Sequence, residues 1–223
     1  MKIGVLGTGM VGETLGSKLV ERGHEVKMGS RDARNPKAIA WAQKAGLKAS
    51  AGSFQDAAKF GELLINCTMG SASVEALKSA GENNLDDKII VDIANALDFS
   101  KGMPPGLTVN VATDSLAEHI QKTFPRAKVV KTLNTVTAPV MVNPASLPGD
   151  HVVFLSGNED AAKQIVAQLL ENDFGWKKTN IVDLGDVTTA RAQEALIIPW
   201  LRLWGKFGSP MFNWQVVTTA KQK

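Results

Sequence analysis

The chain of 223 residues contains no tyrosine, one cysteine and three histidines. A single cysteine excludes an internal disulfide bond, and the few His and Cys residues show no spacing typical of a metal site, so no metal is expected. The common alcohol dehydrogenases move a hydroxyl proton with a Tyr/Lys pair, a His/Asp pair or zinc, and the sequence offers no clear example of these. We expect His24, His119 and His151 to be structural or solvated. Cys67, at the end of the apolar run 63–67, is expected to be a buried thiol within a strand.

Charge of one sign and long hydrophobic runs are also scarce. The formal net charge of +3 is small and dispersed, which argues against nucleic-acid binding. No apolar run approaches the roughly 20 residues needed to cross a bilayer, and the N-terminus leads into a predicted strand without room for a signal peptide. We therefore expect a cytoplasmic protein that binds neither nucleic acid nor membrane. With 44% hydrophobic and 21% charged residues, the composition is that of a globular protein.

The most informative segment that is present is KIGVLGTGMVG at residues 2–12. Its apolar start predicts a buried parallel strand, and a helix is predicted over 13–22. Between them, Gly7, Gly9 and Gly12 form the G-x-G-x-x-G pattern of a dinucleotide-binding turn. Gly7 permits the tight turn, Gly9 lets a pyrophosphate approach the backbone, and Gly12 lets helix and strand pack closely. Free N–H groups and the helix dipole then face the phosphates.

The end of the second predicted strand, 25–28, indicates which dinucleotide binds. An NAD site usually has Asp or Glu about 20 residues after the glycines, where it holds the ribose hydroxyls. Here Ser30 and Arg31 occupy that place, with Lys37 close behind, and a guanidinium binds a 2′-phosphate that a carboxylate would repel. The sequence therefore favours NADP over NAD. NAD remains the alternative because of Asp32. If the end of the second strand were shifted by one residue, the Asp32 carboxylate would reach the ribose hydroxyls.

Predicted strands and helices alternate, which indicates a Rossmann-type, doubly wound and mostly parallel α/β sheet with helices on both faces and a helical C-terminal extension. The expected strands are 3–6, 25–28, 47–49, 62–67, 88–93, 129–135, 151–155 and 180–184. The expected helices are 13–22, 36–45, 53–58, 114–124 with a Ser115/Glu118 capping box, one that begins at Asn158 with Ala162, Ile165, Val166 and Leu169 on its apolar face, and a helical region from Thr188. Residues 95–110 are expected to form a loop.

The C-terminal part is rich in large apolar residues. They are Leu196, Ile197, Ile198, Trp200, Leu201, Leu203 and Trp204. A helix through this segment should break or restart near Pro199, which lacks an N–H. We expect core packing or a two-fold dimer interface here, with stacking on a planar ligand as the alternative. The chain is thus divided into an NADP-binding Rossmann domain, 1–150, and an αβ and helical portion, 151–223, that completes an acceptor site or a dimer interface.

Ligands of open α/β sheets bind beyond the carboxyl ends of the strands. The residues expected there are small or neutral polar groups, namely 8–11, 30–31, 68–70, 94–95 and 132–135. None is an obvious acid or base, so the catalytic residue stays unidentified. Hydride transfer to a flavin-like ring suits such a site, because the ring takes up the charge and the protein supplies binding and orientation.

These segments resemble the family of NADPH-dependent deazaflavin (coenzyme F-420) reductases, which is related to the oxidoreductase domain of the six-transmembrane metalloreductases. The resemblance covers most of the chain. It is carried by GTGMVG at 7–12, GSR at 29–31, IIVDIAN at 89–95, VVKTLNTV at 129–136 and FLSGNEDAAKQIV at 154–166. The Trp-rich C-terminus matches neither relative well, and Asp32-Ala33 resembles a small insertion before the segment that holds Lys37.

The resemblance implies how NADP(H) is held. Its pyrophosphate would lie against Thr8, Gly9, Met10 and Val11, its 2′-phosphate against Ser30, Arg31 and Lys37, its middle against Thr68 and Met69, and its nicotinamide near Thr132 and Asn134. We expect a homodimeric NADPH-dependent oxidoreductase that passes hydride between NADP(H) and a small flavin- or deazaflavin-like acceptor. A reductase of a small carbonyl or imine, and a non-catalytic NADP(H)-binding redox sensor, are the alternatives.

Overall fold

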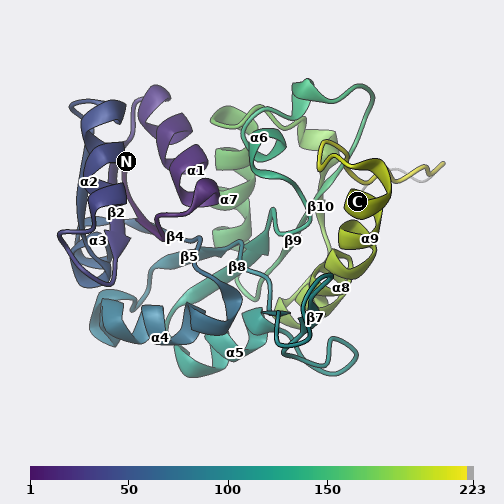
Figure 1. Cartoon of the computed structure of the whole chain (residues 1–223), viewed down its shortest axis with the longest axis horizontal. Helices are drawn as coiled ribbons and strands as arrows, with labels where there is room; N and C mark the ends of the chain where they lie inside the picture. Colours follow the sequence, from purple (N-terminus) through teal and green to yellow (C-terminus); the bar gives the residue numbers. More distant parts are fainter. Residues whose placement is uncertain (220–223) are drawn as a thin grey trace.

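The computed structural model describes residues 1–219, in which eight strands form one sheet between two layers of helices (Figure 1). The strands are β1 (Lys2–Leu6), β2 (Glu25–Ser30), β3 (Ala49–Ser53), β4 (Leu63–Asn66), β5 (Ile89–Asp92), β8 (Lys128–Thr132), β9 (Val153–Ser156) and β10 (Ile181–Asp183). Their order across the sheet is β10-β9-β8-β5-β4-β1-β2-β3, and only the β8–β9 pair in this described sheet is antiparallel. The order from β3 to β8 is that of a Rossmann fold, which confirms the predicted fold class.

Helices cover both faces of the sheet because its central strands are apolar on both sides, as in other parallel sheets. One layer contains α1 (Met10–Glu21), α2 (Pro36–Ala45), α6 (Ala138–Met141) and α7 (Asp160–Asn172). The opposite layer contains α3 (Phe54–Phe60), α4 (Gly70–Ala80), α5 (Leu116–Thr123) and α8 (Ala190–Ala195). The short 3-10 turns are η1 (Glu82–Asn84), η2 (Pro144–Ser146), η3 (Lys178–Asn180) and η4 (Val187–Thr189). Each layer has its own buried hydrophobic cluster.

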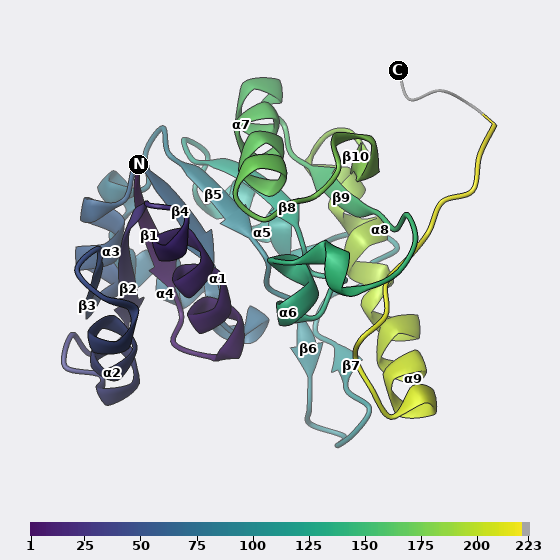
Figure 2. The same ribbon diagram turned by 90° about the horizontal axis from the view of Figure 1, so that it is seen from above.

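Two elements project beyond the carboxyl ends of the central strands. Helix α9 (Ile197–Phe207) and a hairpin of β6 (Leu97–Asp98) and β7 (Gly106–Leu107) extend side by side (Figure 2). After α9 the chain returns to the sheet, where the Val152 N–H donates to the Trp214 carbonyl oxygen at 2.9 Å. As predicted, the helix restarts near Pro199, because α8 ends at Ala195 and α9 begins at Ile197. Pro199 lies in the first turn of α9, where a backbone N–H would have no acceptor within the helix, so proline is tolerated there.

The structure differs from the sequence predictions in several elements. Helix α4, over 70–80, was not predicted, and the strand predicted at 47–49 lies at Ala49–Ser53. Residues 95–110, predicted as a loop, contain the β6–β7 hairpin. Ile165, predicted on the apolar face of α7, is 41% exposed, because the buried stripe of α7 passes through its neighbours instead.

Two predicted helix caps are wrong or incomplete. Asn158 does not cap α7: Glu159 is the N-cap residue, and the Asn158 side chain instead accepts from the first backbone N–H of η4 at 3.1 Å. Ser115 caps α5 as predicted by accepting from the Glu118 N–H at 3.1 Å. The reciprocal half of the capping box is missing, because the Ser115 N–H donates to Asp114 Oδ1 at 2.8 Å, while the Glu118 carboxylate accepts from the Ser115 hydroxyl and from Arg191 of α8.

Among residues 1–219, no helix combines the length and the apolar composition that a membrane crossing requires.

Candidate active site

The turn after β1 forms the first part of the candidate site. Gly7 has a φ of +122°, which L side chains rarely adopt, and a Cβ there would lie 2.6 Å from the Cys67 carbonyl oxygen. A Cβ on Gly12 would lie 2.2 Å from the Gly7 carbonyl oxygen, whereas one on Gly9 would have no atom within 4 Å. The turn is therefore packed at Gly7 and Gly12 and open at Gly9. Gly9 caps α1 without a side-chain hydrogen bond, which leaves first-turn N–H groups available to an anion.

The end of β2 carries the residues predicted to select NADP. Ser30 is buried, and its hydroxyl donates to the Asp32 carbonyl oxygen. The Asp32 carboxylate accepts from the Arg34 backbone N–H at 2.9 Å and so closes its own turn. Arg31 and Lys37 are exposed, and neither side chain has an ion pair or hydrogen bond within residues 1–219. Arg31 and Lys37 are thus two unpaired cations at the position where the sequence predicts a 2′-phosphate. The nearby Asp32 carboxylate already accepts a backbone hydrogen bond.

Two connected hollows follow the carboxyl ends of β1, β4 and β5, where a Rossmann fold binds its ligand. The proximal cleft, of about 290 Å³, is lined mainly by 67–70 after β4 and 93–95 after β5. The distal cleft, of about 380 Å³, continues from it to α9. Val11, Asn95 and Phe99 line both clefts, so the two form one continuous space.

Several residues predicted to contact the cofactor lie along these clefts. Thr68 and Met69 line the proximal cleft, whereas Met10 and Asn134 line the distal one. Thr132 lines neither cleft, because it ends β8 and its side chain is fully buried. Within the described chain, the Thr132 hydroxyl and the Asn134 Oδ1 are buried without a hydrogen-bond partner. Such groups are rare in folded proteins, and a bound ligand is one way to satisfy them.

The distal cleft is apolar and aromatic, with a few polar groups. Its aromatic and polar lining residues are Phe99, Trp200, Trp204, Asn95, Asn134 and Thr137. The ring centroids of Trp200 and Trp204 lie 5.5 Å apart, and the indole N–H of Trp200 has no partner within residues 1–219. No described residue that lines this cleft has an ionisable side chain. The cleft therefore offers shape and stacking surface, but no general acid or base.

Cys67 lines the proximal cleft and is half-buried. It follows β4 directly rather than lying inside the strand, which corrects the sequence prediction. Burial, and to a smaller extent the charge of Asp92, raise the pKa of the Cys67 thiol far above its ordinary value. The thiol therefore stays protonated at neutral pH and is a poor nucleophile.

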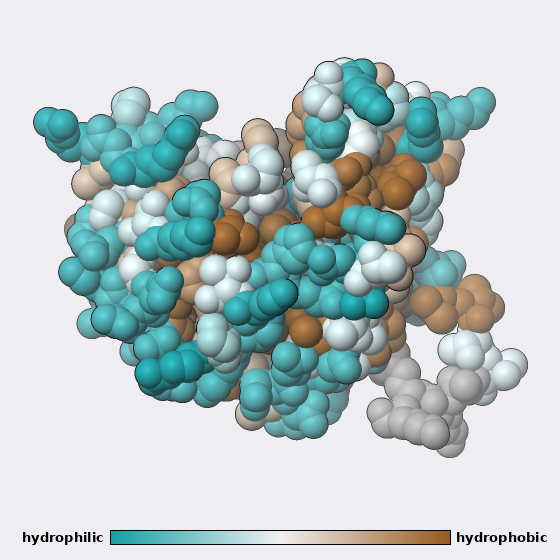
Figure 3. All heavy atoms as spheres, turned by 90° about the horizontal axis from the view of Figure 1, so that it is seen from below, coloured by the Kyte–Doolittle hydropathy of each residue, from teal (hydrophilic) through white to brown (hydrophobic). Residues whose placement is uncertain are grey.

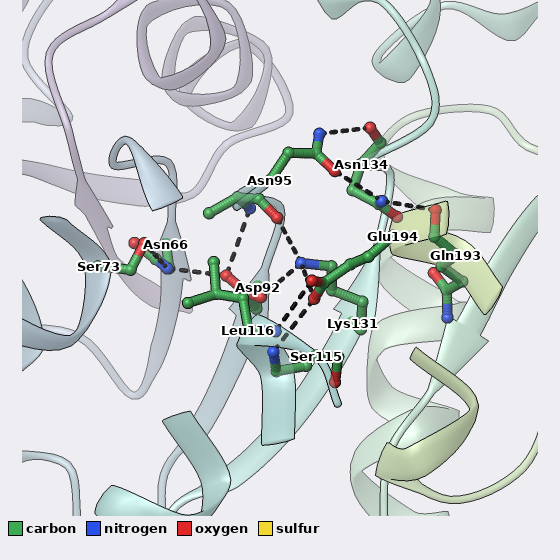
Figure 4. Close-up of polar contacts among 12 residues, drawn as sticks. Asn66, Ser73, Asp92, Asn95, Ser115, Leu116, Lys131, Asn134, Gln193 and Glu194 are labelled. Carbon is green, nitrogen blue, oxygen red and sulfur yellow. Dashed lines mark hydrogen bonds and ion pairs between the residues drawn. The ribbon is translucent and has the colours of Figure 1, made fainter. Parts of the chain in front are cut away.

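Next to the clefts lies a buried ion triad that the sequence analysis did not predict (Figure 4). Lys131 Nζ lies 2.8 Å from Asp92 Oδ2 and 3.0 Å from Glu194 Oε1, and it also donates to the Ala94 carbonyl oxygen. Glu194 accepts two further hydrogen bonds from first-turn N–H groups of α5. All three charged side chains are at most 1% exposed. Burial lowers the pKa of Lys131, but the two carboxylates outweigh burial and hold this pKa above its ordinary value of 10.5.

Hydrogen bonds extend the triad toward the proximal cleft, and a second group of hydrogen bonds lies beside the triad at the distal cleft (Figure 4). Asn66 donates to the triad at 2.8 Å and accepts from the Thr68 hydroxyl, in the proximal cleft, at 2.6 Å. In the distal cleft, Asn134 donates to Asn95 Oδ1 at 3.0 Å and to the Gln193 carbonyl oxygen of α8 at 3.1 Å. The network therefore connects the ends of β4, β5 and β8 to α8, the helix that precedes α9.

Comparisons with known proteins agree with this geometry. The family model described as NADP oxidoreductase, coenzyme F-420-dependent, matches residues 2–96. A crystal structure from Arthrobacter sp. FB24, of a protein provisionally named an F-420-dependent NADP reductase, is 48% identical with a TM-score of 0.91. That likeness covers 98% of this chain and 100% of the other. The chain belongs to the F-420-dependent NADP oxidoreductase family. It is an NADP-dependent oxidoreductase and binds NADP(H).

Two further likenesses are more distant. The metalloreductase STEAP3 of Rattus norvegicus is 28% identical over 206 residues, which make up 91% of this chain and 38% of that protein. The chain thus spans well under half the length of this curated relative. A reductive aminase from Aspergillus terreus, solved with NADPH and ethyl-5-oxohexanoate, is 19% identical, with a TM-score of 0.65 over 93% of this chain and 62% of that one. This last likeness shows a shared fold alone.

For this NADP oxidoreductase, the sequence predicts the phosphate-binding side of the site but does not predict the charges beside the clefts. The phosphate side follows from one local pattern, since Gly7, Gly9 and Gly12 define the turn by themselves. The triad had a weaker signal: Asp92 and Lys131 each interrupt an apolar strand, and the β5–β8 register places them opposite one another.

Proposed function

We propose that this protein transfers hydride between NADP(H) and a flavin- or deazaflavin-like acceptor, a small molecule that binds in the distal cleft. The observation that carries the proposal is the lining of this cleft, which is aromatic and, among the described residues, contains no ionisable side chain. Reduction of a carbonyl or imine usually requires a positioned proton donor, whereas a flavin-like ring takes up the charge itself. The names of the matched family and of the Arthrobacter relative support the same acceptor class.

The residues around the clefts fit NADP(H), which supplies the hydride when bound. We assign the pyrophosphate to the turn of Gly7, Thr8, Gly9, Met10, Val11 and Gly12. The 2′-phosphate is assigned to Ser30, Arg31 and Lys37, the middle of the cofactor to Thr68 and Met69, and the nicotinamide end to Thr132 and Asn134. The open space at Gly9, the unpaired cations and the unsatisfied Asn134 Oδ1 support this assignment. Residues 1–150 would then form the NADP-binding domain, and the portion from 151 would complete the acceptor side.

We further propose that the protein acts in the cytoplasm as a homodimer. Helix α9 leaves Ile198 and Phe207 exposed by 48% and 61%, which is more apolar surface than a solvated helix normally presents. The chain has a single cysteine and therefore no internal disulfide bond, which suits a reducing compartment. Light scattering over a range of protein concentrations tests the dimer, and a monomer at every concentration would contradict it.

The acceptor is tested by following NADPH oxidation with four classes of compound. Coenzyme F-420 and flavins should support turnover, whereas ferric chelates without flavin, and small ketones or imines, should not. The expected signal is a loss of NADPH absorbance together with bleaching of the acceptor ring. Turnover of a ketone or imine without any flavin would contradict the proposal. It would also require a proton donor that the described lining of the distal cleft does not contain.

A further inference from the structure

A second hollow lies next to the distal cleft, on the side of α9 that faces the hairpin. This outer groove, of about 470 Å³, is lined by Met103 and Pro104 of the β6–β7 connection and by residues between 201 and 208. Met103, Leu201 and Trp204 also line the distal cleft, so the two spaces share a wall. Figure 3 shows hydrophobic surface gathered on the lobe that carries the hairpin and α9, to the right of the hollow at the upper edge. The outer groove and the distal cleft therefore lie next to one another, with Trp204 in the lining of both.

A glycine on its wall leaves space in the outer groove. Gly205 lies on its wall within α9, and a Cβ placed there would have no atom within 4 Å. Trp204 is 40% exposed and Met103 is 69% exposed, so both present apolar surface to whatever occupies the groove. The space and its lining therefore suit a flexible chain attached to a ring, in addition to the ring itself.

The apolar outer groove has one charged residue in its lining. Arg202 is the single ionisable residue among those of the described chain that line the groove. It is exposed, and no ion pair or hydrogen bond holds its guanidinium within residues 1–219. An unpaired guanidinium beside apolar surface is suited to bind a phosphate or carboxylate through two parallel hydrogen bonds.

We propose that the outer groove binds the side chain of the hydride acceptor, and that Arg202 binds an anionic group, a phosphate or carboxylate, on that chain. The proposal rests on the proposed function, because it requires a flavin-like ring in the distal cleft. It adds a specificity determinant to that function: Arg202 distinguishes acceptors that share one ring but differ in the charge of the side chain. Riboflavin and FMN form such a pair, because they differ only by a phosphate at the end of the ribityl chain.

The test compares the KM for FMN and for riboflavin in the wild type, in Arg202→Gln and in Lys206→Gln. The wild type should favour FMN by about fivefold, as expected for one partly exposed charge-assisted contact. Arg202→Gln should remove that preference by raising the KM for FMN alone, with the affinity for NADPH unchanged. Lys206→Gln is the matched control, because Lys206 is a cation one turn further along α9 that does not line the groove. It should leave the preference intact.

A second variant tests the groove itself. Gly205→Leu should fill the groove without distorting α9, since its Cβ meets no neighbour, and it should raise the KM for both flavins by a similar factor. Gly205→Ala should have little effect. Equal KM values for FMN and riboflavin in the wild type, or an equal effect of Arg202→Gln on both, would overturn the role of Arg202.

Equilibrium binding separates this proposal from the proposed function. If flavins are not reduced, but FMN still quenches protein fluorescence more tightly than riboflavin in an Arg202-dependent manner, the anion site stands and the proposed reaction fails. If flavins are reduced without any Arg202-dependent preference, the reaction stands and the anion site fails. If neither flavin is reduced or bound and coenzyme F-420 is not reduced either, both proposals are wrong.

Discussion

Replacing Lys131 by methionine should destabilise the fold by far more than the loss of one surface ion pair. Methionine keeps the length of the side chain but removes the ammonium group that separates Asp92 from Glu194. Because both carboxylates are at most 1% exposed, water cannot replace the lost partner. Removing one member of a buried ion pair typically costs about 3–5 kcal/mol, and we expect Lys131→Met to fall in this range.

Lys163 provides a matched control. Its side chain is 7% exposed, and its ammonium group pairs with Asp160 and Asp183, whose side chains are 86% and 48% exposed. Lys163→Met therefore leaves carboxylates that water can solvate, and it should cost no more than about 1 kcal/mol. The measurement is urea unfolding of both variants, followed by circular dichroism. If the two variants lose similar stability, the triad is not the buried charge cluster that its geometry indicates.

The dependence on pH gives this prediction a second readout. A base whose folded-state pKa is raised contributes stability that is complete below its unfolded value and is lost only as pH rises through the folded value. Because the pKa of Lys131 lies above 10.5, its contribution in the wild type should be constant from about pH 6 to 9. The stability deficit of Lys131→Met should therefore be the same at about pH 6 and at about pH 9. A deficit that already shrinks within this range would contradict this explanation.

Three further predictions concern the cofactor side of the site. NADPH should bind at least about tenfold more tightly than NADH, a difference of about 1.4 kcal/mol. Arg31→Ala should remove most of this preference while NADH binding is unchanged, as measured by calorimetric titration. A variant that keeps the preference would favour Asp32 as the ribose ligand. Gly9→Val should abolish NADPH binding but retain the fold, because the position is open, whereas Gly12→Val should lose the fold to a clash with the Gly7 carbonyl; normal NADPH titration of Gly9→Val would mean that the turn is only structural. Because the pKa of the Cys67 thiol is raised, iodoacetamide at about pH 8 should label it much more slowly in the native than in the urea-unfolded protein; equal rates would refute the protonated thiol.

The sequence predicts the first half of the fold better than the second because the signals in the first half are local. A buried parallel strand is a short apolar run, and the glycine pattern after β1 dictates its own turn. Helix α4 has no comparable signal, since its buried face contains Gly70, Ser73, Ala76 and Ala80, which are too small to produce a clear hydrophobic period. The cap of α7 was misplaced because Asn158 is a good N-cap residue by type, but its side chain serves η4 instead.

The difference between local signals and contacts between distant segments also explains which part of the candidate site could be predicted. Ser30 is the last residue of β2, and Arg31 and Lys37 follow it closely, so these three predicted residues are close together in the sequence itself. The triad needs the β5–β8 register to place Asp92 beside Lys131, and it needs α8 to return to the sheet from much later in the chain to supply Glu194. Such a cluster has no pattern within any single window of sequence. An Asp and a Lys in two apolar strands were the one trace of it in the sequence, and only the β5–β8 register shows that they lie opposite one another.

The two sides of the site also depend on different parts of the fold. The phosphate turn is held by backbone contacts within β1, β2 and β4, such as the Gly7 N–H that donates to the Gly29 carbonyl oxygen at 3.0 Å. The acceptor side depends on α8, which is bound to the triad through Glu194 and to Asn134 through the Gln193 carbonyl oxygen. Because α9 continues directly from α8, these contacts set where Trp200 and Trp204 stand beside the strand ends. On the proposed assignment of the site, we therefore expect changes in α9 to alter the acceptor while NADP(H) binding is retained. The likeness to the Arthrobacter protein covers 98% of this chain and so includes these helices, which makes that protein the natural second case for the FMN and riboflavin comparison.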